Sequence, residues 1–360
     1  MMISIQTSVS KAWLNKEKGF SFGEEYYLNP FFRKKQEEEI NLFVKNRFPD
    51  VPMYYMEDDL MQAPFVRPDQ ILVGGIQPNM FLAVALGAKF RFFPDKDSDI
   101  EGYPLKGIQS KDELPDINKI LSHPFIKKIE EQIHEIKTKH PELVVIPPFF
   151  WDTSGRATIH GIITTSFRFI GDDAMMMMLT NPGLMHEIHC WVTDTYIKLI
   201  RYFAQLGGMK ITSLHVGECS GTMLDVESYR EFILPYINKL GTKLAPIRLH
   251  SCGMTDHLIE AIAEIKNLYA ISTGSGTSVK KIREKMGKEF HINIVPPATL
   301  LQKGVERERI RQWIEQVIEN NAEGNLSISY HLEPAYDFEN CMFIHQYLKE
   351  KGIVEQKRLY

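Results

Sequence analysis

The chain has 360 residues, of which 44% are hydrophobic and 24% are charged, and its formal net charge at pH 7 is −4. This length suffices for one large α/β barrel or for two modest domains. The slightly acidic balance argues against nucleic-acid binding as the main role. Charged residues interrupt the long apolar stretches before membrane-spanning length, and the N-terminus lacks the pattern of a secretory signal. We therefore expect a cytoplasmic protein without a nucleic-acid or membrane partner.

The N-terminal third is less regular than the rest of the chain. Residues 31–48 are charged and helix-like, and residues 94–118 are polar and rich in turn residues. Two short apolar runs, at 71–73 and 90–93, predict strands. We interpret residues 1–60 as an N-terminal helical extension that packs on the main domain.

From about residue 143 onward, short apolar runs alternate with amphipathic helices. The helices show a period of 3.6 residues, as in Ile310, Ile314 and Val317. The strands of this part are predicted at 143–146, 211–214, 246–249, 268–271, 291–295 and 326–330. Together with the two N-terminal strands they number about eight, which favours an α/β fold of the (β/α)8 TIM barrel type in a single domain, residues 1–360. A doubly wound open sheet is the alternative.

Ligand-type residues follow several of these strands. In a barrel of parallel strands, the active residues lie at the strand C-termini, where the βα loops meet. The residues in such positions are His215, Gly217, Glu218 and Cys219 after the strand at 211–214, His250 and Cys252 after the strand at 246–249, and Tyr330, His331 and Glu333 after the last strand. The sequence therefore predicts that these side chains gather on one rim.

The segment His250-Ser251-Cys252-Gly253 is the strongest chemical signal in the chain. Side chains at i and i+2 of an extended backbone share one face, so that the imidazole and the thiolate could bind one ion. Zinc accepts both ligand types. Four cysteines in a chain of this length cannot form a disulfide framework, and scattered thiols in a reducing compartment indicate metal binding, catalysis or packing. A packed core pair is the alternative interpretation of His250 and Cys252.

Three pieces of the sequence carry a family resemblance. They are Asp225-Val226-Glu227-Ser228-Tyr229-Arg230-Glu231-Phe232-Ile233-Leu234-Pro235-Tyr236, Arg248-Leu249-His250-Ser251-Cys252-Gly253, and Asp337-Phe338-Glu339-Asn340. In order and spacing, the segment from about 148 to 350 resembles the uroporphyrinogen decarboxylase superfamily and, within it, the zinc-dependent, corrinoid-linked methyltransferases. The resemblance implies a (β/α)8 barrel with its site at the C-terminal mouth.

Two departures from the family pattern bear on function. The decarboxylases share an Arg-rich N-terminal motif that holds substrate carboxylates, and nothing similar stands in the first hundred residues here. In the methyltransferases with a His-x-Cys pair, a third thiolate comes from the last strand, but the matching stretch 329–333 has no cysteine. Glu218 and His331 are therefore the candidates for the third zinc ligand beside His250 and Cys252. We predict that Cys341 is a packing residue on a helix.

The resemblance implies a zinc-dependent methyltransferase that moves a methyl group between a small heteroatom substrate and a corrinoid (cobalamin) on a partner protein. Zinc would activate a thiol-type nucleophile or a leaving group as a Lewis acid. Glu218 and Tyr330 are the predicted catalytic side chains on the rim. The expected partners are a corrinoid-binding protein and a small methylated substrate or methyl acceptor. A decarboxylase-type lyase and a non-catalytic barrel relative are the alternatives.

Overall fold

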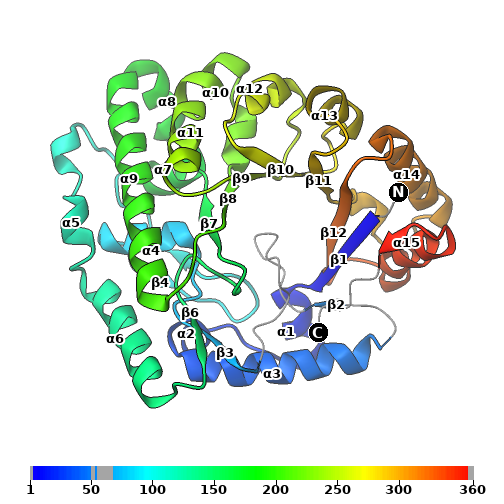
Figure 1. Ribbon diagram of the computed structural model, residues 1–360, viewed down its shortest axis with the longest axis horizontal. Helices are drawn as coiled ribbons and strands as arrows, with labels where there is room; N and C mark the ends of the chain where they lie inside the picture. The colour runs from blue at the N-terminus through cyan, green and yellow to red at the C-terminus, as the bar shows by residue number, and fades with distance from the viewer. Residues whose placement is uncertain (1–2, 50–52, 55–67, 356–360) are drawn as a thin grey trace.

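The computed structural model describes residues 3–49, 53–54 and 68–355, and it confirms the alternation of strands and helices (Figure 1). A parallel sheet of nine strands runs in the order β13-β1-β12-β11-β10-β9-β8-β7, and β2 pairs with β1 off this path. These strands are β1 (Ile3–Val9), β2 (Met53–Tyr54), β7 (Arg156–His160), β8 (Ser213–Gly217), β9 (Ile247–Ser251), β10 (Leu268–Thr273), β11 (His291–Ile294), β12 (Leu326–Leu332) and β13 (Val354–Glu355).

Helices cover the outer side of this curved sheet, as Figure 1 shows. The α-helices are α1 (Lys11–Lys18), α2 (Glu24–Leu28), α3 (Pro30–Arg47), α4 (Pro78–Ala85), α5 (Ile117–Ile120), α6 (Pro124–Lys139), α7 (Ile162–Ile170), α8 (Asp173–Thr180), α9 (Pro182–Gly207), α10 (Val226–Phe232), α11 (Leu234–Lys243), α12 (Ile259–Ala263), α13 (Val279–Met286), α14 (Arg307–Asn321) and α15 (Phe338–Glu350). Short 3-10 helices are η1 (Lys111–Glu113), η2 (Cys219–Met223), η3 (Asp256–Leu258) and η4 (Ala298–Leu300). No helix among those described combines the length and the apolar character needed to cross a membrane.

The predicted eight-stranded ring does not close through backbone pairing in the described residues. The strands β3 (Gln70–Leu72) and β6 (Val144–Ile146) pair in parallel with each other but form a separate sheet. The predicted strand at 90–93 is also not a barrel strand, because β4 (Phe90–Arg91) pairs antiparallel with β5 (Asp99–Ile100). The polar, turn-rich segment between these two strands returns the chain directly, so that they form a hairpin. The main sheet is therefore an open, curved parallel sheet.

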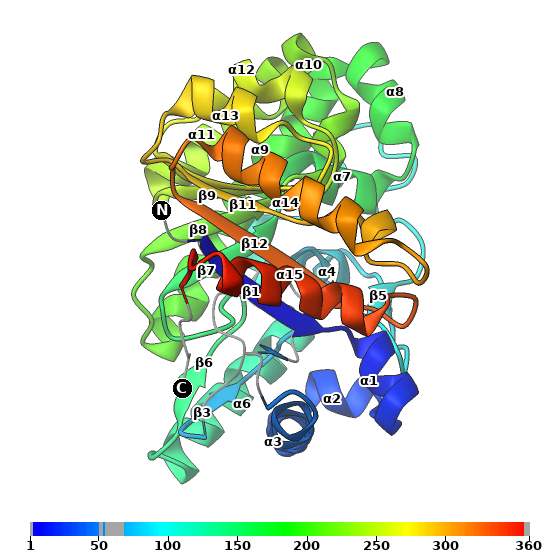
Figure 2. The same ribbon diagram turned by 90° about the vertical axis from the view of Figure 1, so that its right-hand side faces the viewer.

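The N-terminal residues correct a second expectation. Residues 3–9 fall in the predicted helical extension, but they form β1, which lies beside β12 (Figure 2). On its other edge, β1 pairs with β13. The register with β12 runs from Ile3 opposite Leu326 to Val9 opposite Leu332. The segment ISIQTSV is rich in β-branched residues, which favour a pleated backbone. The helical part of the predicted extension is present as α1, α2 and α3, and its residues at 50–52 and 55–60 lie outside the described part of the chain.

The two faces of the main sheet differ in character. Alternate positions such as Leu214, Val216 and Leu249 are fully or almost fully buried in the hydrophobic core that the helices share. The positions between them carry polar side chains, for example Arg248 and His250. These side chains lie on the other face of the sheet, because successive side chains of a strand point to opposite faces. The face away from the helices is therefore lined by polar residues, many of them buried. This polar face leads to the rim at which the strands end.

Candidate metal centre

The candidate site is built where β8 and β9 end side by side. The two strands are parallel neighbours, with Gly217 opposite His250 in the register. The amide of Glu218 donates a hydrogen bond to the carbonyl of His250 at 2.8 Å, which ties the chain leaving β8 to the last residues of β9. The 3-10 helix η2 then begins at Cys219. Two loops from different strands are thus held together at one point of the rim.

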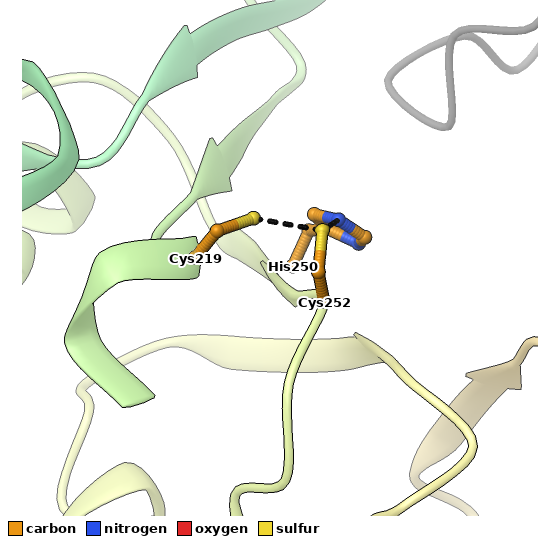
Figure 3. A group of neighbouring side chains, drawn as sticks. All are labelled: Cys219, His250 and Cys252. Atoms are coloured by element: carbon orange, nitrogen blue, oxygen red, sulfur yellow. Dashed lines mark hydrogen bonds between the residues drawn. The ribbon is translucent and has the colours of Figure 1, made fainter. Parts of the chain in front are cut away.

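Three side chains converge at this point, namely Cys219, His250 and Cys252 (Figure 3). The Sγ atoms of Cys219 and Cys252 are 3.0 Å apart, and Nε2 of His250 lies 3.0 Å from Sγ of Cys252. Across the described part of the chain, this is the group in which three His, Cys, Asp or Glu side chains bring ligand atoms within 4.8 Å of one another. His250 is buried, whereas Cys252 is exposed and Cys219 is half-buried. The group is therefore reachable from the rim.

The donor set and its spacing fit a zinc ion. Tetrahedral zinc binds thiolate sulfur at about 2.3 Å and imidazole nitrogen at about 2.0–2.1 Å, which places two thiolate ligands about 3.8 Å apart. The two sulfur atoms here are 3.0 Å apart, so their side chains need to spread by less than ~1 Å to hold such an ion. Three protein ligands with one position left for water or substrate is the pattern of catalytic rather than structural zinc.

The close approach of two backbones supports the loop that carries Cys252. The amide of Gly274, directly after β10, donates to the carbonyl of Ser251 at 3.0 Å. A Cβ atom at position 274 would lie 1.9 Å from the carbonyl oxygen of Cys252, which no side chain tolerates. Glycine is therefore required at position 274 for the β9 and β10 loops to pack as they do.

The surroundings of the group act on its protonation. In the absence of a bound cation, the hydrogen bond with Cys252 and burial raise the pKa of the Cys219 thiol above its usual range. Below the group, the rings of His215 and His250 stack with centroids 5.9 Å apart. Nη1 of Arg248 lies 2.5 Å from Nδ1 of His215, and a guanidinium only donates, so Nδ1 is the acceptor. Burial, followed by the charge of Arg248, holds the pKa of His215 well below its usual value, so this ring is neutral.

Glu218 points to the helix that follows β7, and its carboxylate is not a member of the Cys-His-Cys group. One carboxylate oxygen accepts hydrogen bonds from the amide and the hydroxyl of Thr164, both at 2.9 Å, and the other accepts from the amide of Ile163 at 3.3 Å. These donors belong to the first turn of α7, where the helix dipole favours a negative charge. Burial nevertheless raises the pKa of Glu218 to about 7, against the lowering effect of these hydrogen bonds.

The structure does not bring His331 or Tyr330 to the Cys-His-Cys group either. Nδ1 of His331 lies 2.6 Å from the hydroxyl of Ser8 on the neighbouring strand β1. Tyr330 is on the opposite face of β12, because side chains alternate along a strand, and its hydroxyl donates to the carbonyl of Cys341 at 2.6 Å. Cys341 is fully buried on α15, which confirms the prediction that it packs in the core.

The sequence places Cys219 on the same rim as His250 and Cys252, but it does not single out Cys219 as a candidate ligand. The family pattern puts the third thiolate on the last strand, and residue types alone do not show which rim residues become neighbours. The signal that identifies Cys219 is the neighbourhood of β8 and β9, because the first residue after one strand then faces the motif at the end of the next. That neighbourhood belongs to the sheet order, which the structure provides.

Comparison with known proteins places this architecture in a family. The family described as uroporphyrinogen decarboxylase (URO-D) matches residues 79–350, a span that includes Cys219 and the His250–Cys252 motif. No curated protein sequence matches the chain.

Several solved structures are similar to this chain. A methyltransferase from Methanosarcina mazei aligns over 98% of this chain and 94% of its own, with a TM-score of 0.62 and 15% sequence identity. A B12-independent methionine synthase from Shewanella sp. W3-18-1, in complex with selenomethionine, aligns over 62% of this chain and 67% of its own, with a TM-score of 0.38 and 8% identity. The YdjI aldolase from Escherichia coli K12 aligns over 57% and 73%, with a TM-score of 0.23 and 15% identity. The likeness to the Methanosarcina mazei structure concerns the fold.

Proposed function

This chain belongs to the uroporphyrinogen decarboxylase family, and from that premise we propose that it is a zinc-dependent methyltransferase. The reaction moves a methyl group between a small heteroatom substrate and the corrinoid of a partner protein. The observation that carries the proposal is the convergence of Cys219, His250 and Cys252 at the rim of the sheet. A protein described as a methyltransferase shares the fold over nearly the whole chain.

In this proposal, Cys219, His250 and Cys252 are the zinc ligands. Zinc bound there with one open position would supply Lewis acidity that stabilises the negative charge of a substrate thiolate or alkoxide. The two thiols provide soft, anionic ligands once they lose their protons, and His250 provides a neutral one. The half-buried position of Cys219 and the exposed position of Cys252 leave the open side of the group toward the rim.

Of the two proposed catalytic residues, Glu218 is better supported by the structure than Tyr330. The pKa of Glu218 is about 7, so its carboxyl group can hold or release a proton near neutral pH while it is held at the first turn of α7. The hydroxyl of Tyr330 donates a hydrogen bond to the carbonyl of Cys341 on helix α15, on the helix-covered side of the sheet. This position argues for a packing role. His331 belongs to a separate part of the rim and is no longer needed to complete a three-ligand set.

Metal content is the first test of the proposal. We expect about one zinc per chain in the purified protein by elemental analysis. Cys219→Ser and Cys252→Ser should each remove it, while circular dichroism and the cooperative thermal transition remain, because the core supplies most of the stability of a chain this size. Zinc retention in the double variant Cys219→Ser/Cys252→Ser would exclude this site.

Methyl exchange with a corrinoid is the second test. The spectrum of the corrinoid distinguishes cobalt(I) from methylcobalt(III), so transfer is followed directly with the cognate corrinoid protein. We would screen methylated amines, aryl methyl ethers, methanol and thiol acceptors, with Cys252→Ser as the metal-free control. Zinc-independent loss of carboxylate from a tetrapyrrole would instead support the decarboxylase alternative, which the missing Arg-rich motif disfavours.

A further inference from the structure

A chain of buried hydrogen bonds runs from His250 across the next two strands. Nδ1 of His250 lies 3.0 Å from the hydroxyl of Ser272 on β10, and this hydroxyl donates to Oδ1 of Asn293 on β11 at 3.0 Å. The three residues occupy matching positions of neighbouring parallel strands, since Ser272 stands opposite both His250 and Asn293. They therefore share the polar face of the sheet.

The partners of Asn293 give this chain a direction. Its Nδ2 donates to the hydroxyl of Ser327 at 2.7 Å, so that its Oδ1 faces Ser272 and also accepts from Ser329 at 2.9 Å. A serine hydroxyl has a single proton, and the proton of Ser272 is used on Asn293. Ser272 must then accept a hydrogen bond from Nδ1 of His250. Nδ1 of His250 consequently carries the proton, and its Nε2 presents a lone pair to the side where Cys252 lies.

Burial stabilises this direction of the hydrogen bonds from His250 through Ser272 to Asn293. Ser272 is fully buried and Asn293 is 2% exposed, so bulk water does not compete for the hydrogen bonds between them. A buried hydroxyl that lost its acceptor at Asn293 would turn toward the other available acceptor, Nδ1 of His250. That turn would favour a proton on Nε2, the nitrogen that must be unprotonated to bind a metal ion.

We propose that Asn293 is a positioning residue for metal binding, and that it acts through Ser272 to hold His250 in the tautomer whose Nε2 is unprotonated and can bind the ion. This inference deepens the proposed function and rests on it. Partners beyond the immediate ligands commonly fix the orientation and tautomer of a metal-binding histidine, and their loss lowers metal affinity about 10- to 100-fold.

Two serines provide a matched test. Ser272 and Ser329 both donate to Oδ1 of Asn293, but Ser272 also contacts His250. We expect Ser272→Ala to weaken zinc binding about 10- to 100-fold in a competition titration with a chelating dye, and Ser329→Ala to leave it within about threefold. Equal losses in the two variants would overturn the inference, because they would indicate a general effect of the polar network.

A second pair of variants separates tautomer control from packing. Asn293→Leu removes the acceptor for Ser272, whereas Asn293→Asp keeps it. The nitrogen chemical shifts of ¹⁵N-histidine in the zinc-free protein report the tautomer of each ring. We expect the Nδ1–H form of His250 in the wild-type protein and in Asn293→Asp, and a shift toward the Nε2–H form in Asn293→Leu. An Nε2–H form in the wild-type protein would refute the inference.

The outcomes also distinguish this inference from the proposed function. Should the wild-type protein bind no zinc while the tautomer follows Asn293 as expected, the proposed function fails and the positioning of His250 stands. Should the wild-type protein and the Ser272→Ala variant bind zinc with equal affinity, the proposed function stands and the positioning role fails. If Asn293→Leu does not fold, the serine pair still decides between these results.

Discussion

Two groups of ligand-type side chains stand at the rim where the parallel strands end. One consists of Cys219, His250 and Cys252 beside β8 and β9, and the other of His331 and Glu333 at the end of β12. In the first group, the ligand atoms face one another within 4.8 Å. In the second, each side chain is bonded to a serine of the N-terminal segment, His331 to Ser8 at 2.6 Å and Glu333 to Ser10 at 2.8 Å.

The second group lines a cavity of about 470 Å³, and its side chains do not form a compact set of ligand atoms. The residues around this cavity are Ser10, Ala12, Asp95, Lys96, Asp97, His331 and Glu333. Asp97 forms an ion pair with Lys11, and the side chain of Lys11 is almost fully buried. Burial acts to raise the pKa of Asp97, but the pairing with Lys11 holds this pKa below its usual value. Asp97, His331 and Glu333 thus each have a partner of their own in this region.

The difference shows that residue type on a rim does not identify a candidate metal site. Both groups contain residues that zinc accepts, and both lie at strand C-termini. What distinguishes the Cys-His-Cys group is that its ligand atoms converge from adjacent strands, whereas the polar atoms of the other group have serine partners from β1 and the residue after it. The predictions below test this distinction.

The largest expected effect comes from the thiols. Replacement of Cys219 or Cys252 by serine should lower zinc affinity more than about a hundredfold, because each removes a ligand and so exceeds the range for outer partners. The matched control is His331→Ala, which should leave zinc affinity within about twofold. A metal titration monitored with a chromophoric chelator measures both. Loss of zinc in His331→Ala with retention in Cys219→Ser would reverse the assignment of the two regions.

Gly274→Ala tests the support of the Cys252 loop. The new Cβ would lie 1.9 Å from the Cys252 carbonyl oxygen, so the loop must shift, at a cost on the order of 1–3 kcal/mol in the free energy of unfolding and a clear loss of zinc affinity. Gly183→Ala on helix α9 is the control, since its new Cβ would have no atom within 4 Å apart from its chain neighbours and the backbone of its own helix, and it should be neutral or stabilising. Unchanged zinc affinity in Gly274→Ala would show that the loop geometry is not needed.

Glu218→Gln tests whether this carboxyl group is a buried acid rather than a ligand. In the folded protein its pKa is about 7, above its ordinary value of 4.5, so its contribution to stability is fully present below pH 4.5 and is lost as the pH rises through 7. In the zinc-free protein, the variant should lack this decline, which amounts to roughly 3 kcal/mol between pH 4.5 and 7.

Urea titrations of the zinc-free protein at several pH values measure this decline. The same Glu218→Gln variant should keep its zinc when the metal is supplied. Parallel pH profiles of wild type and variant would contradict the raised pKa, and zinc loss would restore Glu218 as a ligand.

Cys341→Ala should have the smallest effect. Its side chain is fully buried against the helix side of β12, and removal of the sulfur should lower the free energy of unfolding by about 1 kcal/mol. Zinc content should not change. Thermal denaturation and metal analysis of the same preparation decide the matter, and a zinc-free Cys341→Ala protein would show that the last strand contributes a ligand after all.

Several elements of the fold and site could be predicted from local patterns. The helix α14 follows from the spacing of Ile310, Ile314 and Val317, all of which are buried, and the strand β9 follows from its β-rich run. The placement of His250 and Cys252 at the end of that strand was predicted for the same reason. The strand β1 is not predicted, because seven residues near a terminus carry a weak periodic signal and the strand depends on its pairing with β12, β13 and β2.

Local sequence patterns are enough to predict the alternation of strands and helices, the rim at which the ligand-type residues lie, and the His-x-Cys motif. These features depend on periods of 2 and 3.6 residues and on residue chemistry, which are local properties. Long-range contacts bring Cys219 next to Cys252, direct Glu218 to the first turn of α7, and leave the sheet open in the described residues. These outcomes depend on which strands become neighbours and on which polar atoms form hydrogen bonds with each other. Strand order and hydrogen-bond competition arise from contacts between residues far apart in the chain, so no local pattern encodes them.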